Sequence, residues 1–477
     1  MKIFGTDGIR DIVNHGFLRP SFLDKLGRVI GADICSGHKS PKAIIGRDTR
    51  PSGKSIEKIL FNALASSAVA VDRAGIISTP GLAYLAKCGK YSVGIMISAS
   101  HNPVEYNGIK LFASNGLKIN ASIEERMEDR LLDASLPKMS TSGTHPPPAG
   151  EPRPNGGPPA KERDGLAVLR HSKSPASERR LAARYFADIP KIVLGAETDI
   201  LSPGFRIVLD CANGALSDIA PDMFSRTGAT VIAINRQSDG KNINCRCGSL
   251  HPEALRKKVL SAKAHVGFSF DGDGDRVIMA DEKGNIRDGD FVLYIAAGFL
   301  KKRRLLKRNT VVGTIMTNSA LENTFAGQGI KLVRTPVGDK YVLDEMLKKG
   351  FSIGGEPSGH IIFADYSKNG DGVITALVML RIMAEENKTL GQLSKGFSRY
   401  PQIIVNVPVS AKPPLEEIVP IKQAEDEIHD ILRGRGRLVL RYSGTENLCR
   451  IMIEGKSLPY VKSLANKLAG VIKKSLG

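Results

Sequence analysis

The chain repeats one local theme that restricts its fold more than any other feature: an apolar run, then a Gly-rich polar loop, then a helical pattern. The apolar runs with their loops cover residues 43–48, 93–100, 206–214, 265–275 and 310–318. Continuous apolar character indicates strands that are buried on both faces, as in parallel or mixed α/β sheets. Helical spacing predicts a helix over residues 55–70. We therefore expect α/β domains whose functional loops lie at the carboxyl ends of the strands.

The length of 477 residues exceeds what a single core organises, so we expect several domains. Their predicted bounds are 1–136, 181–284 and 285–400 for three α/β domains and 401–477 for a smaller α+β domain. Residues 137–180 interrupt the pattern, because 137–177 hold nine of the 26 prolines. Such a composition cannot bury enough apolar surface to offset its ordering entropy. We interpret it as a linker or surface insertion, with a polybasic docking arm as the alternative.

The charge balance narrows the classes of partner. A net charge of +19 fits nucleic acid, anionic lipid or a phosphorylated small molecule. Trp is absent and aromatic residues make up only 5%, which disfavours the stacking of single strands on the protein. The chain also lacks an apolar run of about 18 residues and an N-terminal signal stretch. We therefore expect a cytoplasmic protein with local anion sites and with neither a membrane nor a nucleic-acid partner.

Three aspartates follow the apolar run VGFSF in phase, at Asp271, Asp273 and Asp275. Alternate residues of an extended segment project to one side, so the three carboxylates converge. Carboxylates this close repel each other, and a hard divalent cation relieves that repulsion. An EF-hand loop would use the same aspartates with Glu282, but Arg276 stands where its sharp turn needs Gly. A surface acidic turn is the remaining alternative.

A second motif, SASHNP, places Ser100 and His101 at the end of an apolar run, with NGIK and Lys110 close behind. A serine at the end of a strand, followed by a turn that Pro103 restricts, is expected to be exposed and reactive. A Ser–His–Asp hydrolase is disfavoured, because the G-x-S-x-G elbow is missing and an adjacent His does not easily reach its neighbour's hydroxyl. A serine-capped turn stays open as the alternative.

Two further motifs carry groups suited to a phosphate or a sugar. RYSGTE, with Arg450 beyond it, joins two guanidinium groups to hydroxyls and a Gly-permitted turn, which suits a phosphate. GGEPSGH sets an acid, a hydroxyl and a histidine on a Gly-rich loop, which suits sugar hydroxyls. Residues 46–55 end like a Walker A loop, but their glycines are too far apart, so no ATP site is predicted.

Five motifs, in order along the chain, resemble the α-D-phosphohexomutase superfamily: FGTDGIR, ISASHNP, DGDGDR, GGEPSGH and RYSGTENLCR. The resemblance spans nearly the whole chain except residues 137–177. It implies three related mixed-sheet α/β domains and a smaller C-terminal α+β domain around a central cleft. The first and last motifs are most similar to the bacterial members that interconvert glucosamine 6-phosphate and glucosamine 1-phosphate through a bisphosphorylated intermediate.

The resemblance also implies roles for individual residues. Ser100 would be the phosphoserine that the reaction requires, and with Asp271, Asp273 and Asp275 it would hold one Mg²⁺. The groups around the transferring phosphoryl would be Arg10, His101, Lys110 and His360, with Lys110 or Arg10 helping proton transfer. The remaining substrate contacts would be Arg276, Glu356, Ser358, Arg441, Ser443, Gly444, Thr445 and Arg450.

Three positions depart from the family pattern: Asp11 where Gly is usual, Pro357 where Gln is usual, and Asn447 where Pro is usual. Activity on mannose or glucose phosphates is therefore kept as an alternative. A non-catalytic binder of anionic polymers on the same fold is the alternative from another class. We expect a monomer or a homodimer.

Overall fold

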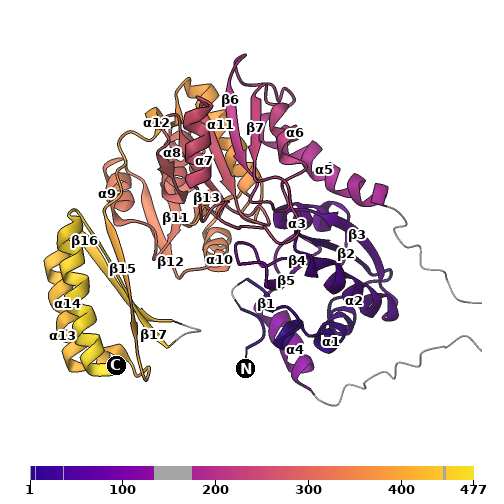
Figure 1. Cartoon of the computed structure of the whole chain (residues 1–477), viewed down its shortest axis with the longest axis horizontal. Coiled ribbons are helices and arrows are strands. Elements are labelled where there is room, and N and C mark those ends of the chain that lie inside the picture. Colours follow the sequence, from indigo (N-terminus) through magenta and orange to yellow (C-terminus); the bar gives the residue numbers. More distant parts are fainter. Residues whose placement is uncertain (1, 6, 36, 134–174, 444–446) are drawn as a thin grey trace, which may run out of the picture.

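The structure, a computed structural model, describes residues 2–5, 7–35, 37–133, 175–443 and 447–477. Its strands form four sheets that follow one another along the chain (Figure 1). Each of the first three sheets combines parallel pairs with antiparallel pairs at one edge, whereas the fourth is entirely antiparallel. The predicted fold class is confirmed: three mixed-sheet α/β units precede a smaller α+β unit.

The first unit holds the sheet β1-β5-β4-β2-β3. Its elements are β1 (Ile9–Ile12), η1 (Gly16–Leu18), α1 (Pro20–Ile30), η2 (Gly31–Cys35), β2 (Lys42–Arg47), α2 (Ser52–Ser66), β3 (Ala70–Ile76), α3 (Thr79–Cys88), β4 (Val93–Ile97), β5 (Tyr106–Ala113) and α4 (Ala121–Leu132). The helix expected over 55–70 is thus shifted, because Ala70 already begins β3. The strand β4 ends at Ile97, so Ser98 to Ser100 lie in the following loop.

The second unit repeats this arrangement with the sheet β10-β9-β8-β6-β7. Its elements are β6 (Arg206–Asp210), α6 (Ala220–Ser225), β7 (Thr230–Ile234), α7 (Glu253–Ser261), β8 (Val266–Phe270), β9 (Val277–Asp281) and β10 (Ile286–Arg287). All five residues of β8 are buried, as its continuous apolar sequence predicted. The aspartate motif forms the tight connection between β8 and β9.

The third unit is built on the sheet β12-β11-β13-β14. Its elements are α8 (Gly289–Lys302), η3 (Lys307–Asn309), β11 (Thr310–Thr314), α9 (Ser319–Gly327), β12 (Lys331–Thr335), α10 (Asp339–Lys349), β13 (Ile353–Gly355), β14 (Ile361–Phe363), α11 (Gly372–Glu386) and α12 (Leu390–Leu393). Helix α11 is buried along nearly its whole length, so it acts as a core helix and not as an amphipathic cover.

Helix α5 (Pro175–Leu194) connects these units. It begins inside the stretch 137–180 that was predicted as a linker or insertion; residues 137–174 of that stretch lie outside the described residues. Tyr185 packs in a continuous apolar core that runs through the second and third units and reaches α3 of the first. The Tyr185 hydroxyl donates a hydrogen bond to Asp371 of α11 at 2.6 Å, and the Tyr84 hydroxyl of α3 donates one to Asp188 at 2.7 Å. Shared burial of this kind keeps the three units, and therefore their loops, in a fixed relation.

The C-terminal unit stands apart from the first unit, at the other side of the molecule (Figure 1). It consists of β15 (Gln402–Pro408), η4 (Leu415–Glu417), α13 (Val419–Leu432), β16 (Gly436–Tyr442), β17 (Leu448–Gly455) and α14 (Leu458–Leu476), with its own apolar core. It meets the third unit through polar contacts such as Arg437 Nη2 to the Thr317 carbonyl at 2.9 Å and the Ser319 amide to Glu454 Oε1 at 2.8 Å. A separate core with a polar seam is the arrangement that permits rigid-body motion.

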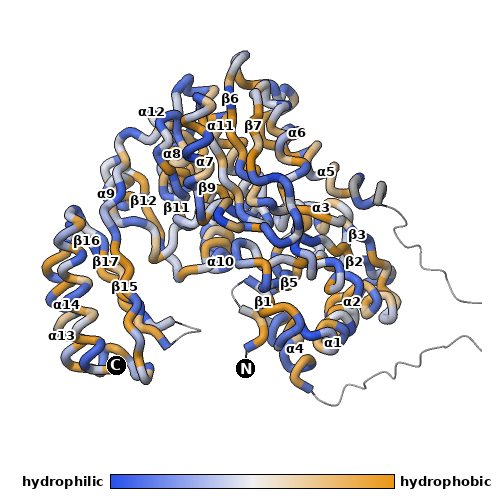
Figure 2. The backbone as a smooth tube through the Cα atoms, in the orientation of Figure 1, coloured by the Kyte–Doolittle hydropathy of each residue, from blue (hydrophilic) through white to orange (hydrophobic). Residues whose placement is uncertain are grey.

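Apolar segments run through the centres of the units, while polar segments colour many of the loops and outer turns (Figure 2). Within the residues that the structure describes, none of the helices combines the length and the apolar character needed to cross a bilayer.

Candidate active site

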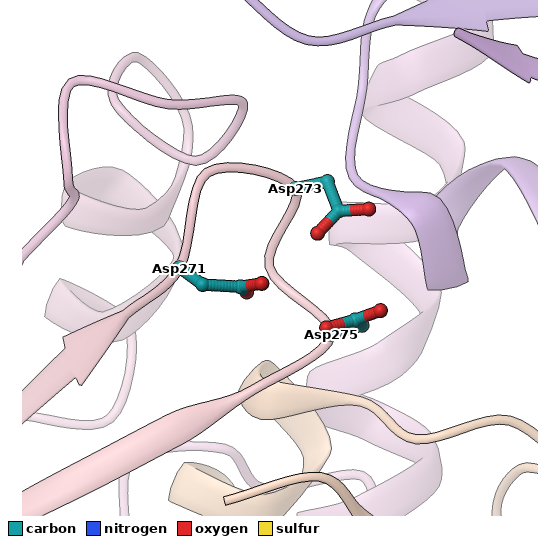
Figure 3. Close-up of side chains that lie close together, drawn as sticks. All are labelled: Asp271, Asp273 and Asp275. Atoms are coloured by element: carbon teal, nitrogen blue, oxygen red, sulfur yellow. The ribbon is translucent and has the colours of Figure 1, made fainter. Parts of the chain in front are cut away.

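The predicted aspartates converge on one buried point. Ligand oxygens of Asp271, Asp273 and Asp275 all lie within 4.8 Å of one another, and the three side chains come from a single loop (Figure 3). Gly274 in this loop has φ of +74°, a conformation that favours glycine. A Cβ on Gly272 would lie 2.7 Å from the Ser100 carbonyl oxygen, so only glycine lets the two loops pack this closely.

The EF-hand alternative is excluded by the surroundings of this loop. Strands flank it on both sides, where an EF-hand has helices. Glu282 does not face the aspartates but accepts hydrogen bonds from Thr389 Oγ1 at 2.9 Å and the Gly391 amide at 3.0 Å. The surface-turn alternative is also excluded, because all three aspartates are buried.

The electrostatics of the aspartates fit a divalent cation. Burial and the carboxylates of Asp275 and Asp273 raise the pKa of Asp271 well above its usual range. Burial acts in the same direction on Asp275, but Lys110 and His360 outweigh it and hold the pKa of Asp275 well below its usual range. Asp273 Oδ1 and Asp275 Oδ1 are buried and have no hydrogen-bond partner among the described residues. Buried, unsatisfied carboxylate oxygens are the hard donors that Mg²⁺ prefers, so the residues fit such an ion.

Ser100 is fully buried, which corrects the expectation of an exposed serine. Its Oγ donates a hydrogen bond to Asp271 Oδ2 at 2.5 Å. His101 Nδ1 lies 3.3 Å from the same Oγ, so the expectation that an adjacent histidine does not reach the hydroxyl is wrong. The reason is the backbone: Ser100 has φ of +52°, in the left-handed region that turns the chain back on itself. Residues held in this region are over-represented at functional sites.

A fully buried arginine, which the sequence analysis missed, holds the Ser100 loop in place. Arg50 Nη2 donates to the carbonyls of Ser100 at 3.0 Å and Asn102 at 2.8 Å, and Nη1 donates to that of Pro103 at 2.6 Å. Asp48 fixes the guanidinium, with its Oδ2 3.0 Å from Arg50 Nε. These two residues belong to the segment 46–55 that resembles a Walker A loop, so its function here is to support another loop.

The second unit also contacts the loop that carries Ser100. Asn244 Nδ2 donates a hydrogen bond to the backbone carbonyl oxygen of Ser100 at 2.8 Å. Thr79, at the start of α3, donates from its Oγ1 to Asp273 Oδ2 at 2.5 Å. Neither residue stands in a motif that marks chemistry, and both reach the site only because the first two units are packed together.

Lys110 and Arg10 bring positive charge to the serine and the aspartates. Lys110 Nζ lies 3.0 Å from Asp273 Oδ2. The carboxylates of Asp273, Asp7 and Asp275 outweigh burial and raise the pKa of Lys110 well above its usual range. Arg10 Nη1 donates to Asn102 Oδ1 at 3.1 Å. His101 responds in the opposite direction, since burial, then Arg276 and Arg10, lower its pKa to about 4. Lys110 therefore contacts the aspartate loop, whereas Arg10 and His101 lie at the loop that carries Ser100.

The predicted sugar loop connects β13 to β14 on the third unit. Glu356 accepts a hydrogen bond from the Gly338 amide at 3.1 Å, while Ser358 Oγ is buried without a partner in the described part of the chain. His360 is buried with Nδ1 3.8 Å from Asp275 Oδ1. The carboxylates of Asp275 and Asp339 outweigh burial and raise the pKa of His360. The structure thus brings His360 of this loop to the aspartates.

The predicted phosphate motif lies on the C-terminal unit and is not brought against Ser100. Arg441 on β16 stands directly opposite Arg450 on β17 in the antiparallel ladder. Like charges at such a pair are destabilising unless an anion lies between them. Ser443 is buried, and its carbonyl accepts a hydrogen bond from Lys412 Nζ at 2.8 Å. The predicted contacts Gly444 and Thr445 lie outside the described residues.

The fold and this arrangement define an enzyme class with three α/β units and a smaller fourth unit that has its own core. Sequence models of the phosphoglucomutase/phosphomannomutase family match the chain in four parts: its α/β/α domain I at residues 1–137, domain II at 183–284, domain III at 288–400 and its C-terminal domain at 404–471. The chain belongs to the phosphoglucomutase/phosphomannomutase family.

Relatives and solved structures agree with this membership. The chain is 41% identical to a phosphoglucosamine mutase of Brevibacillus brevis, covering 100% of this chain and 99% of the relative. It is 40% identical to that of Clostridioides difficile, with the same coverage. A phosphoglucomutase/phosphomannomutase family protein from Burkholderia thailandensis shares the fold with a TM-score of 0.76 at 20% identity, over 99% of this chain and 97% of the other. The Aspergillus fumigatus N-acetylphosphoglucosamine mutase, solved with GlcNAc-6P and magnesium, gives 0.60 at 19% identity, over 91% and 83%.

Of the three departures from the family pattern, Asp11 has a side-chain role in a local turn, whereas the contacts of Pro357 and Asn447 are made by backbone carbonyls that any residue supplies. The Asp11 carboxylate accepts hydrogen bonds from the amides of Ile12 at 2.8 Å and Phe17 at 2.9 Å. The Pro357 carbonyl accepts from the Gly289 amide at 3.2 Å, and the Asn447 carbonyl accepts from the Val409 amide at 3.0 Å. The carboxylate of Asp11 therefore accepts hydrogen bonds from the backbone amides of a local turn.

Proposed function

We propose that this protein is a phosphoglucosamine mutase of the cytoplasm, which interconverts glucosamine 6-phosphate and glucosamine 1-phosphate for amino-sugar nucleotide and cell-wall precursor synthesis. The observation that carries the proposal is the hydrogen bond of Ser100 Oγ to the buried Asp271, at 2.5 Å. It occurs in a chain about 40% identical over its full length to several phosphoglucosamine mutases. We propose a monomer or homodimer as the working form.

The reaction begins with a phosphorylated Ser100. The bond from phosphorus to Ser100 Oγ breaks as a bond forms to the free hydroxyl of the sugar phosphate, and the proton of that hydroxyl ends on Ser100 Oγ. The resulting bisphosphorylated sugar turns over and returns its other phosphate to Ser100 Oγ. Atoms balance over the cycle, and the enzyme recovers its phosphoserine.

The chain's own residues neutralise and orient the transferring group. Lys110 and Arg10 would supply positive charge to the transferring group, and one of this pair would relay the proton, giving one to Ser100 Oγ and taking one from the sugar hydroxyl. His101 and His360 border the same space from two different units. Phosphoryl transfer depends mainly on such positioning and charge stabilisation.

Mg²⁺ would be held by Asp271, Asp273 and Asp275 together with the phosphate on Ser100. When bound, this ion neutralises charge on the phosphoryl oxygens as a Lewis acid. The donor set supports this assignment because two of its carboxylate oxygens are buried without a hydrogen-bond partner among the described residues.

Substrate reading is divided between two units. Glu356 and Ser358 would bind sugar hydroxyls, with Arg276 at the border of the aspartate loop. Arg441, Ser443, Gly444, Thr445 and Arg450 would bind the phosphate that is not being transferred. Because these residues bind a phosphate apart from Ser100, either phosphate of the intermediate can serve as the anchor. The polar interface of the C-terminal unit would allow this unit to move as the sugar turns.

Mass spectrometry and turnover together test the proposal. The purified protein is digested and the peptide carrying Ser100 is examined for phosphate, and then rates are measured with glucosamine, mannose and glucose 1-phosphates. We expect phosphate on Ser100 and the highest kcat/KM with glucosamine 1-phosphate. A higher value with mannose or glucose phosphate overturns the substrate assignment. No turnover, combined with salt-sensitive binding of a polyanion, makes the protein a binder and not an enzyme.

We predict that Arg441→Met weakens substrate binding more than it slows the reaction. A phosphate anchor acts equally in the ground state and the transition state, so its loss raises KM and leaves kcat nearly unchanged. Hydrogen bonds to a charged group contribute about 1.5–3 kcal/mol, which corresponds to about a ten- to a hundredfold rise in KM. Steady-state kinetics with glucosamine 1-phosphate measure it. Arg433→Met, an exposed arginine of the same unit, is the matched control, and equal effects of the two variants would contradict the anchor role.

A further inference from the structure

Asp7, from the FGTDGIR motif, pairs with two lysines beside the aspartates. Its Oδ2 lies 2.9 Å from Lys110 Nζ and its Oδ1 lies 2.6 Å from Lys118 Nζ. Lys110 continues to the aspartate loop, with Nζ 3.3 Å from Asp275 Oδ2. The carboxylate of Asp7 therefore connects Lys110, which contacts the aspartate loop, to Lys118.

Lys118 contacts the third unit, and a histidine of the third unit lies near the aspartate loop. Lys118 Nζ lies 2.6 Å from Asp339 Oδ2, at the start of α10. His360 Nε2 lies 3.6 Å from the same oxygen, and His360 Nδ1 lies 3.8 Å from Asp275 Oδ1. Six groups thus form a closed ring in which basic and acidic side chains alternate: Asp7, Lys110, Asp275, His360, Asp339 and Lys118.

The ring is largely shielded from water. The most exposed member, Asp7, has 23% of its side chain accessible, and Lys110 has 1%. Charges in such surroundings are screened little by salt, and removing one partner leaves the other uncompensated. The ring also joins three units: the first supplies Asp7, Lys110 and Lys118, the second Asp275, and the third Asp339 and His360.

We propose that Asp7, Lys118 and Asp339 are positioning residues that hold Lys110 and His360 at a fixed separation on either side of the transferring phosphoryl group. The reaction named here rests on the function proposed above. Lys110 and His360 belong to different units. The shared core fixes the units relative to one another, and the contacts of the ring set where the two charged or polar ends lie within that frame. Displacement of a reacting group by about 1 Å costs about a hundredfold in rate.

Lys118→Met tests the proposal by kinetics. We expect kcat to fall by about ten- to a hundredfold, as for a displaced group, while KM changes by less than about threefold. Lys118→Arg, which keeps the charge, should recover part of the loss. The matched control is Lys340→Met, because Lys340 Nζ lies 2.9 Å from Glu124 Oε2 and joins the same two units outside the ring. If Lys340→Met lowers kcat as much as Lys118→Met, ordinary docking of the units accounts for the effect and the proposal is overturned.

A double-mutant cycle tests whether Lys118 and Asp339 act as one device. Asp339→Asn alone should lower kcat as Lys118→Met does, and the double variant should be no slower than the slower single variant by more than about twofold. Losses that multiply would show that the two residues act independently, which overturns the ring.

Hydrogen exchange separates failure of the ring from failure of the proposed function. In Lys118→Met, peptides that cover residues 338–342 and 358–362 should exchange faster than in the wild type and in Lys340→Met. This result is independent of which sugar the enzyme accepts. A wild type that is inactive with every sugar phosphate overturns the proposed function, whereas unchanged exchange in Lys118→Met overturns the ring.

Discussion

Replacing Ser100 by alanine is expected to abolish turnover almost completely while the fold stays intact. The variant loses the oxygen that carries the phosphoryl group in both halves of the cycle, so the enzyme holds no phosphoryl group that it could transfer. Removal of a nucleophile in other covalent mechanisms costs up to about 10⁶-fold, and we expect a loss of at least about 10⁴-fold in kcat. The conversion of glucosamine 1-phosphate to its 6-phosphate measures it, and the Ser100 peptide should no longer carry phosphate.

A second buried serine provides the matched control. Ser217 is also buried, and its hydroxyl donates only to the Gly214 carbonyl at 2.8 Å. Ser217→Ala should keep a kcat within about twofold of the wild type, because the substitution removes one neutral hydrogen bond away from Ser100. Wild-type turnover in Ser100→Ala would contradict the phosphoserine cycle outright.

Asp273→Asn is expected to remove both metal binding and most of the activity. The substitution keeps the shape of a fully buried side chain but removes the charge that the ion needs. A bound ion contributes several kcal/mol of charge stabilisation in the transition state, so we expect kcat to fall by about 10³-fold. Chelation of the wild type by EDTA should have the same effect, and added Mg²⁺ should reverse it.

Thermal unfolding gives a measurement of the same site without turnover. A ligand that binds the folded state alone raises the melting temperature, so Mg²⁺ should raise that of the wild type and leave Asp273→Asn unchanged. Asp290→Asn is the control, since Asp290 is another fully buried aspartate and lies in the third unit. A shift with Mg²⁺ that persists in Asp273→Asn but is lost in Asp290→Asn would place the ion elsewhere.

Local patterns in the sequence were sufficient for the class of fold and for the candidate chemistry. The run VGFSF predicted a strand buried on both faces, and β8 is buried at every residue. The in-phase spacing of Asp271, Asp273 and Asp275 predicted converging carboxylates, and their oxygens lie within 4.8 Å of one another. Both inferences concern residues that are neighbours in the chain. Alternation along a strand explains β8, whereas the aspartates converge through a tight loop in which Gly274 has φ of +74°, and not through the extended segment that was expected. Segment ends were less reliable, as the shifted helix at 55–70 shows, because packing decides where a helix stops.

The tertiary structure alone decided the environment of these groups. Arg50 of the first unit and Asn244 of the second unit both donate hydrogen bonds to the carbonyl oxygen of Ser100. These contacts hold the Ser100 loop between the two units, where the serine is buried and not exposed. His101 reaches the hydroxyl of its neighbour because the backbone is held at a positive φ that the sequence pattern does not reveal.

The sequence by itself therefore determined which reactive groups this protein carries: a serine, three aspartates and a set of cations in a strand-and-loop framework. The tertiary structure decided which partners those groups have. Lys118 and Asp339 are 221 residues apart, yet their charged atoms lie 2.6 Å from each other. The physical reason is that hydrogen bonds and ion pairs act over a few ångströms of space whatever the separation along the chain, and only the packing of the first unit against the third brings these residues within that range.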